Sequence, residues 1–174
     1  MSIRTYFDPL HKEISLDSNQ PEEDLVKKLV DTSPFQRLRR IKQLGPAYMT
    51  FQGAESSRFS HSLGAFHIAR RILTSLTSIN SSLQKYKGII YCSSLLHDIG
   101  HGPFSHTSEG MFNLKHEKWS SKIIREQNDI YQILEEYQQG FSNTIANIIE
   151  GENTTLPIIQ SLISSQLDCD RLDY

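Results

Sequence analysis

The chain has 174 residues, of which 37% are hydrophobic and 22% charged, and its formal net charge is -2. This length suits one domain with a substantial core, and the near-neutral charge argues against a surface coated with positive charge for nucleic-acid binding. The two cysteines, Cys92 and Cys169, form no C-x-x-C pair, which argues against a zinc finger or a disulfide framework and favours a reducing compartment. No apolar stretch is long enough for a signal peptide or a membrane-spanning helix. We therefore expect one soluble, cytoplasmic domain.

Turn and capping residues divide the chain into a short extended segment followed by helices. Residues 1–18 alternate weakly around Asp8 and Pro9 and predict an extended or hairpin-like segment. Pro21, followed by three acidic residues, predicts a helix start, because proline suits the first helical position and carboxylates favour the positive end of the helix dipole. Helices are predicted over residues 21–31, 34–44, 58–76, 85–98, 105–112, 116–126, 129–139, 141–150 and 157–166. The sequence predicts an all-α fold without repeats or linkers.

Apolar spacing identifies the faces of these helices that pack inward. In the helix over 34–44, Phe35, Leu38 and Ile41 recur at three-residue steps, and Gly45 ends the helix before a loop that reaches Ser57. The helix over 58–76 is expected to turn these residues inward: Phe59, Leu63, Phe66, Ala69, Ile72 and Leu73. Core positions are also expected further on, at Trp119, Ile123 and Ile124.

Three of the seven histidines lie in the stretch LLHDIGHGPFSH, residues 95–106. His97 and Asp98 offer an imidazole nitrogen and a carboxylate oxygen side by side, and such mixed donors suit manganese, iron, nickel or zinc, or magnesium with water in its shell. Two ligands do not hold a metal alone, so the hypothesis requires His61 and Asp170 to converge on them from two other segments. The alternative is that His97 caps a helix and Asp98 forms a salt bridge, which is the commoner outcome for an isolated His-Asp pair.

Four segments in order resemble the HD-domain metal-dependent phosphohydrolases: R-F-S-H-S-L-G, then L-L-H-D-I-G-H-G-P-F-S-H, then K-H-E, then D-C-D-R-L-D-Y. The resemblance is closest to the deoxynucleoside triphosphate triphosphohydrolases, which include the SAM-and-HD-domain dNTPases of animals and their bacterial relatives. DPLHKEI and FQRLRRIKQLG extend it over essentially the whole chain. It implies an HD-domain helical array, a divalent metal ion, and hydrolysis of a dNTP to a deoxynucleoside and inorganic triphosphate.

The resemblance also assigns roles to matching residues. The residues that match the metal ligands are His61, His97, Asp98 and Asp170. Arg58 matches an arginine that contacts the triphosphate, and a guanidinium suits phosphate because it donates paired hydrogen bonds. His101 and His116 match histidines around the phosphates, whereas His106 matches the proton donor to the leaving group. Glu109 stands three positions after His106, where the animal enzymes carry aspartate, and this spacing places both on one helix face.

Nucleotide contacts away from the metal are implied as well. Gln43 and Leu44 match residues that line the sugar pocket. Arg171 stands where those enzymes use a phosphate-binding lysine, and Tyr174 matches a tyrosine near the nucleotide. A guanine nucleotide effector is a further implied partner, through three residues that match its binding site in the animal enzymes: Arg4, Asp31 and Arg39. Without the resemblance, the basic run in residues 37–42 is typical of a solvated helix face.

The main departure from the resemblance lies at the end of the chain. Related enzymes continue beyond the segment that matches Asp170 and Tyr174, and they add a helical region that completes the nucleotide pocket and the oligomer contacts. We therefore expect a single HD domain over residues 1–174 that lacks this region, and a homo-oligomer. His11 and His67 have no matching partners and are expected to be structural or surface residues.

Two alternatives remain for the function. One is another HD phosphohydrolase, acting on nucleoside monophosphates or cyclic dinucleotides; the lack of a G-Y-P segment weakens the second version. The other is a noncatalytic nucleotide- or partner-binding module of a larger assembly. The motifs that bind a metal or a nucleotide are consistent with such a module as well as with an enzyme.

Overall fold

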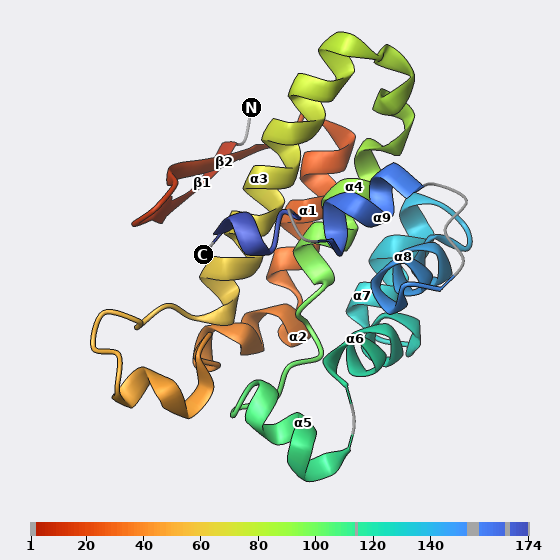
Figure 1. The fold of residues 1–174 in the computed structure, drawn as a ribbon. Coiled ribbons are helices and arrows are strands. Elements are labelled where there is room, and N and C mark those ends of the chain that lie inside the picture. Colours follow the sequence, from red (N-terminus) through yellow and green to blue (C-terminus); the bar gives the residue numbers. More distant parts are fainter. Residues whose placement is uncertain (1–2, 114, 153–156, 166–167, 174) are drawn as a thin grey trace.

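The computed structural model describes residues 3–113, 115–152, 157–165 and 168–173. An antiparallel hairpin opens the chain, and the elements described after it are helices apart from one isolated β-bridge, as Figure 1 shows. The hairpin strands are β1 (Ile3–Asp8) and β2 (Lys12–Asp17). The α-helices are α1 (Pro21–Asp31), α2 (Ser33–Gln36), α3 (Arg58–Ile79), α4 (Lys87–Leu96), α5 (His106–Phe112), α6 (His116–Arg125), α7 (Asp129–Tyr137), α8 (Phe141–Glu150) and α9 (Pro157–Ile163). The 3-10 helices are η1 (Arg37–Arg40), η2 (Gly45–Met49), η3 (Ser81–Tyr86) and η4 (Arg171–Asp173). The predicted all-α fold is confirmed.

The hairpin covers one side of the helical body. Its strands pair in register from Ile3 opposite Asp17 to Asp8 opposite Lys12. The second strand turns Ile14 inward, where it is fully buried and joins the apolar core beside α1. α1 begins at Pro21 as predicted and buries the apolar face of its amphipathic sequence. The hairpin is therefore anchored to the domain by its second strand.

The core lies between α3 and α4, the helices that also lead to the site. Their contact includes an edge-to-face pair of Phe66 and Tyr91, whose ring centroids are 5.1 Å apart. α4 is apolar nearly all round, because α1, α8 and α9 pack against it in addition to α3. On the far side α8 packs against α6 and α7, which lie together in Figure 1. The described buried apolar side chains form one cluster.

The predicted helix over 34–44 is wrong beyond Arg40. α2 and η1 occupy its first part, and Ile41 is then extended, with φ -111° and ψ 115°. The backbone there pairs with the segment before α3: the amide of Gln43 donates to Ser56 O, and that of Arg58 donates to Ile41 O. These hydrogen bonds satisfy backbone groups that a continued helix would have paired internally. The apolar three-residue period is equally compatible with a 3-10 turn, which explains the error.

Several expected boundaries also shift. The loop expected after Gly45 contains the 3-10 helix η2, α3 continues to Ile79, and the helix expected from residue 85 begins as α4 at Lys87, after η3. Ile124 is fully buried as predicted, but Trp119 is 39% exposed and is not a core residue. The helix predicted over 157–166 ends early, because α9 stops at Ile163 and a bend follows at Ser164 and Ser165; Gln166 lies outside the described residues. Among those described, no helix has both the length and the apolar character needed to cross a bilayer.

Candidate active site

The four residues with predicted metal roles come from three separate elements. His61 lies in the first turn of α3, whose N-terminus is capped by Ser57 Oγ accepting from the amide of Ser60. His97 and Asp98 directly follow α4. Asp170 comes from the C-terminal segment before η4, which packs against α3 and is drawn beside it in Figure 1. Residues up to 109 positions apart in the sequence thus meet at one end of the α3–α4 pair.

The structure brings all four of these side chains together. His61 Nε2 lies 2.8 Å from Asp170 Oδ1, and His97 Nε2 lies 3.7 Å from the same oxygen. Asp98 faces both rings, with Oδ2 3.6 Å from His61 Nε2 and Oδ1 3.5 Å from His97 Nε2. Ligand atoms of His61, His97 and Asp170 all lie within 4.8 Å of one another. Two nitrogens and the Asp170 carboxylate therefore face a common point, and Asp98 lies beside them with one oxygen toward each ring.

The chemistry of this donor set fits a divalent cation. His97 Nδ1 lies 2.8 Å from Ser94 O, and because a carbonyl oxygen can only accept, Nδ1 carries the proton. In the neutral ring Nε2 is then the atom with the lone pair, and it points toward the carboxylates. His97 Nε2 is buried and makes no hydrogen bond within the described residues. A buried nitrogen of this kind beside two carboxylates is suited to a first-row metal ion.

The electrostatics of the group also favour a cation. Burial lowers the pKa of His61, but the carboxylates of Asp170, Asp173 and Asp98 outweigh it and raise this pKa to about 9. The pKa of His97 is raised in the same way, against burial, by Asp98 and Asp170. Burial opposes ionisation of Asp98, yet His97, His101 and Arg58 hold its pKa well below the usual range. The site is thus arranged around negative charge that a proton or a metal ion neutralises.

Arg58 is held inside the site in this structure. Its side chain is only 2% exposed, and its Nη1 donates to Asp98 Oδ2. Nε donates to Ser105 Oγ at 3.1 Å and Nη2 donates to Gln43 O at 3.2 Å. The arginine expected at the triphosphate is therefore paired with an expected metal ligand. A phosphate would have to compete with Asp98 for this guanidinium.

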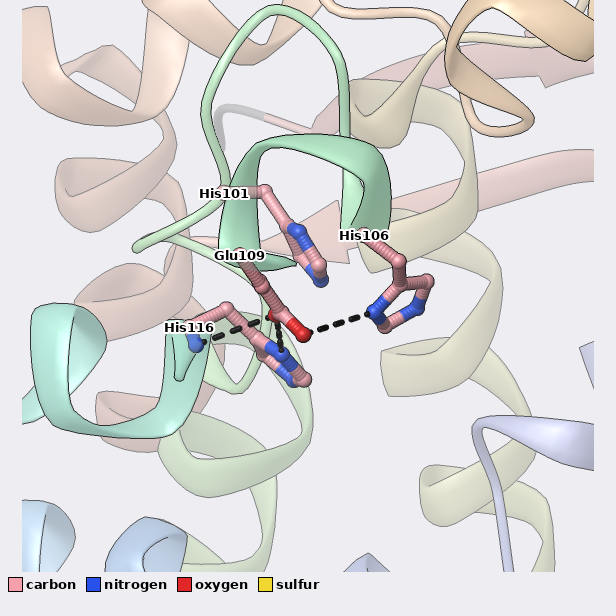
Figure 2. A group of neighbouring side chains, drawn as sticks. All are labelled: His101, His106, Glu109 and His116. Atoms are coloured by element: carbon pink, nitrogen blue, oxygen red, sulfur yellow. Dashed lines mark hydrogen bonds and ion pairs between the residues drawn. The ribbon is translucent and has the colours of Figure 1, made fainter. Parts of the chain in front are cut away.

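A second group of side chains adjoins the first and is drawn in Figure 2. It consists of His101, His106, Glu109 and His116, and Glu109 lies between two of the histidines. Its Oε1 accepts from the His116 backbone amide at 3.1 Å and lies 2.5 Å from His116 Nδ1. Its Oε2 lies 3.3 Å from His106 Nδ1. Glu109 and His106 thus lie on one helix face, as their three-residue spacing predicts.

The four residues of the second group differ in exposure and charge. The His106 side chain is 63% exposed, whereas His101 is buried and stacks on His116 with centroids 4.0 Å apart. Burial lowers the pKa of His101 to about 4, although Asp98 opposes this, so the ring is neutral near pH 7. Burial opposes the ionised form of Glu109, but hydrogen bonds from His116 and His106 lower its pKa to about 2. Glu109 is therefore an ionised acceptor between the two rings.

Asp98 connects the two groups. Its Oδ1 lies 3.3 Å from His101 Nε2 and 3.9 Å from His116 Nε2, in addition to its contacts with His61 and His97. A metal held by the first group would consequently lie beside the histidines of the second group. The arrangement suits a substrate that bears several negative charges and needs a proton at one end.

Backbone contacts fix the loop that carries both groups. The guanidinium of Arg37 donates to the carbonyls of Ile99 and His101, at 2.5 and 2.9 Å. Gly100 lies against the start of α6, where an added Cβ would overlap the backbone of the helix. Ser105 adopts φ 49° and ψ -135°, a strained conformation for a residue with a side chain, immediately before His106. Its Oγ is held by Arg58 Nε and the carbonyl of Lys42, which stabilise this bend.

Comparison with known proteins identifies the family. A sequence model of the HD domain matches residues 58–173, which include all eight residues of the two groups. The chain belongs to the HD domain family. A Bacillus subtilis protein of uncharacterised function, YwfO, is 40% identical to this HD domain protein over 172 residues. The deoxynucleoside triphosphate triphosphohydrolase SAMHD1 of Danio rerio is 39% identical over 127 residues.

A solved structure shares the fold. The crystal structure of a hypothetical protein from Aquifex aeolicus is similar with a TM-score of 0.83 and 34% identity, over 99% of this chain and 45% of that one. This HD domain protein spans less than half of its relatives' own length: 38% of YwfO and 20% of the Danio rerio protein.

The structure places the expected nucleotide residues less closely together. Gln43 is buried and contributes its carbonyl to Arg58, whereas Leu44 beside it is exposed. Arg171 is exposed in η4, one residue after Asp170. The remaining expected substrate residue, Tyr174, lies outside the described residues.

The expected effector residues lie at the hairpin. Arg4 Nη1 lies 2.5 Å from Asp31 Oδ1, and the guanidinium of Arg39 stacks 3.5 Å above the ring of Phe59. A cavity of about 290 Å³ is lined by Arg39 and Phe59 together with β1 residues. Part of the basic run therefore packs on the protein surface, and it is not a uniformly solvated face.

Sequence reasoning missed two residues at the site. Asp173 Oδ2 lies 2.7 Å from His61 Nδ1, and Asp173 Oδ1 lies 2.5 Å from His11 Nε2. His11, expected to be a structural or surface residue, has a side chain that is only 8% exposed and contacts Asp173, which lies 162 positions away in the sequence. The third aspartate of D-C-D-R-L-D-Y was the available signal, but nothing in the sequence spacing links it to the hairpin turn.

Proposed function

We propose that this HD domain is a metal-dependent phosphohydrolase that converts a deoxynucleoside triphosphate to a deoxynucleoside and inorganic triphosphate. Relatives named deoxynucleoside triphosphate triphosphohydrolase, 34–43% identical to the chain, support the substrate class. The observation that carries the proposal is the junction at Asp98 between a donor set for a cation and the Glu109-centred histidine group.

The residues proposed to hold the cation are His61, His97, Asp98 and Asp170. Manganese, magnesium, iron, nickel and zinc are all compatible with two nitrogens and two carboxylates, given water in the remaining positions. When bound, such an ion polarises a phosphoryl oxygen and lowers the pKa of a coordinated water. The carboxylates would then be neutralised, which weakens the hold of Asp98 on Arg58.

The protein's own side chains supply the remaining chemistry. Arg58 and Arg171 donate hydrogen bonds to phosphate oxygens and offset their charge. His101 and His116 flank the phosphates. His101 is neutral near pH 7, so its ring adds no buried positive charge there. Water adds to the α-phosphorus as the bond from this phosphorus to the 5′ oxygen breaks; the departing oxygen takes a proton from His106, and the proton lost by the attacking water passes to solvent.

Glu109 makes His106 suitable for that proton transfer. With Glu109 Oε2 facing Nδ1 of His106, the Nε2–H side of the ring is directed away from the carboxylate and can donate to the leaving group. The ionised carboxylate stabilises the charged ring before transfer and fixes its orientation. This is the role expected of a residue that orients a general acid.

The other expectations complete the proposal. We propose one HD domain over residues 1–174, cytoplasmic and homo-oligomeric, in which Gln43, Leu44 and Tyr174 contact the sugar or base. We further propose that a guanine nucleotide effector binds beside the hairpin at Arg4, Asp31 and Arg39. The cavity lined by Arg39 and Phe59, together with the Arg4–Asp31 pair, supports that position. Titration with a guanine nucleotide should change the assembly state or the rate; no change in either would contradict the effector site.

Product analysis tests the catalytic proposal directly. The purified chain is incubated with Mn²⁺ and the four dNTPs, and deoxynucleoside and triphosphate are quantified. We expect both products in equal amounts. His106→Ala should retain its metal and lose turnover, because the proton donor is removed while the four donors remain. The double variant His97→Ala, Asp98→Ala should lose both metal and turnover.

The same experiment separates the alternatives. Pyrophosphate or orthophosphate in place of triphosphate, or turnover only with nucleoside monophosphates, would assign the chain to another kind of HD phosphohydrolase. Nucleotide binding without any product would support a binding module. Full turnover by His106→Ala would remove this histidine from the acid role.

A further inference from the structure

A series of side-chain contacts connects the hairpin turn to His61. Asp173 Oδ2 lies 2.7 Å from His61 Nδ1, and Asp173 Oδ1 lies 2.5 Å from His11 Nε2. The side chains of Asp173 and His11 are each 8% exposed. A single buried carboxylate thus bridges the β1–β2 turn and the first turn of α3.

Each end of this bridge has a specific support. At the turn, Asp8 Oδ1 accepts from the backbone amides of Leu10 and His11, at 2.8 and 3.0 Å, and this fixes the backbone that carries the His11 ring. At the helix, Gly64 lies one turn after His61, and an added Cβ there would overlap the Asp173 carboxylate. The glycine of R-F-S-H-S-L-G therefore leaves the space in which Asp173 reaches His61.

The geometry determines which nitrogen of His61 is presented to the donor group. Nδ1 is occupied by Asp173, and Nε2 is the atom that faces Asp98 and Asp170, at 3.6 and 2.8 Å. A carboxylate that accepts from one nitrogen of a ligating histidine fixes the ring orientation, leaves the lone pair on the other nitrogen and increases its basicity. Such outer contacts commonly change metal affinity by about 10–100-fold.

We propose that Asp173 and His11 are positioning residues of the metal centre, and that the hairpin turn is part of its support. The proposal rests on the metal site described above under the proposed function. It assigns a role to D-P-L-H in the N-terminal segment and to the last aspartate of D-C-D-R-L-D-Y: together they orient His61 for a divalent cation. Displacing the hairpin turn should therefore weaken metal binding without touching a ligand.

Metal affinity, and not turnover, is the primary test. Mn²⁺ is titrated into the metal-free full chain, and free Mn²⁺ is followed by electron paramagnetic resonance. We expect Asp173→Asn to weaken binding by about 10–100-fold, because the amide cannot accept from both rings. His11→Gln should weaken it in the same direction by less, since Asp173 keeps one partner. The matched control is His67→Gln. The His67 ring lies beside His11, with ring centroids 5.2 Å apart, but its hydrogen bond is with Arg70, outside the bridge to His61.

Gly64→Ala provides an independent variant that keeps every polar group. Its methyl group would displace the Asp173 carboxylate from His61, so the same loss of affinity is expected although no ligand and no bridge residue is altered. The ligand-field bands of the Co²⁺-loaded protein supply a second measurement. They should shift in Asp173→Asn and Gly64→Ala and should match the native spectrum in His67→Gln.

The outcomes distinguish this inference from the proposed function. Native protein that binds one Mn²⁺, with unchanged affinity and Co²⁺ spectrum in folded Asp173→Asn, His11→Gln and Gly64→Ala, would overturn the positioning role and leave the metal site intact. Native protein that binds no Mn²⁺ would overturn the metal site and this inference with it. Where Asp173→Asn does not fold, as judged by circular dichroism, the other two variants decide.

Discussion

Ser120 in α6 makes a testable connection between the two groups of the site. Its Oγ donates to the carbonyl of His97 and accepts from the amide of Gly100, both at 2.8 Å. The side chain is fully buried. Replacing Ser120 with alanine removes both hydrogen bonds, and its gain in helix propensity is matched by the same substitution at another buried helical serine, so the pair isolates the contact between α6 and the loop after α4.

The expected cost follows from the burial of the two backbone groups. His97 is buried, so its carbonyl loses its partner without replacement by water, at about 1–3 kcal/mol. Gly100 is half-buried, and water can satisfy part of its amide, so that end contributes less. We expect Ser120→Ala to lower the free energy of unfolding by about 2–3 kcal/mol. At this chain length that corresponds to a fall in Tm of about 4–12 °C.

Urea unfolding followed by circular dichroism measures this value, and Ser93→Ala is the matched control. Ser93 lies in α4 and is equally buried, but its Oγ has no hydrogen-bond partner within the described residues. The same deletion there removes a polar atom that is already unsatisfied, so the change should stay within about 0.5 kcal/mol or be stabilising. Equal effects of the two substitutions would refute the reasoning, because the cost would then come from volume and not from the hydrogen bonds.

Three further predictions concern the fold and its pH dependence. Burial opposes ionisation of Glu109, but hydrogen bonds from His116 and His106 lower its pKa to about 2, so Glu109 stabilises the metal-free protein fully above about pH 4.5 and this is lost as the pH falls toward 2; Glu109→Gln should flatten the Tm profile between about pH 4.5 and 2. Gly45→Ala places a methyl group in a backbone with φ +53° and 2.7 Å from Phe104 O, so a loss of about 1–3 kcal/mol is expected in urea unfolding, and a neutral result would contradict it. Leu95→Ala removes a fully buried side chain from α4 and should cost about 2–5 kcal/mol, whereas a cost below about 1 kcal/mol would mean that the core collapses around the cavity.

Sequence patterns predicted the elements whose signals are local. Pro21 and the acidic residues behind it determined the start of α1 correctly, because helix capping depends on neighbouring residues only. The segment after Arg40 was predicted wrongly because its backbone pairs with residues 56–58, and pairing across the chain leaves no periodic signal. Trp119 fits the apolar pattern of α6, but that face is only partly covered by neighbouring helices. Tertiary contacts, which the sequence does not display, decided both cases.

The candidate site was predictable to the extent that it is carried by motifs. The expected convergence of His61, His97, Asp98 and Asp170 needed the order of four segments, since no spacing within one segment brings them together. The position of Glu109 relative to His106 followed from helical geometry alone. His11 was not predictable, because its contact depends on how the hairpin turn folds back onto η4.

The pairing of Arg58 with Asp98 suggests how the site tolerates its own charge before a ligand binds. Asp98 is buried, whereas the Asp170 side chain is 36% exposed, so an isolated carboxylate would be strongly destabilising at Asp98. Arg58, with Ser105 and the carbonyl of Gln43 satisfying its other donors, compensates Asp98 in the absence of a cation. A cation at the four donors would take over that compensation and release the guanidinium for an anionic ligand. Metal and phosphate binding at this site should therefore be mutually favourable. We expect the protein to bind inorganic triphosphate more tightly in the presence of Mn²⁺ than in its absence.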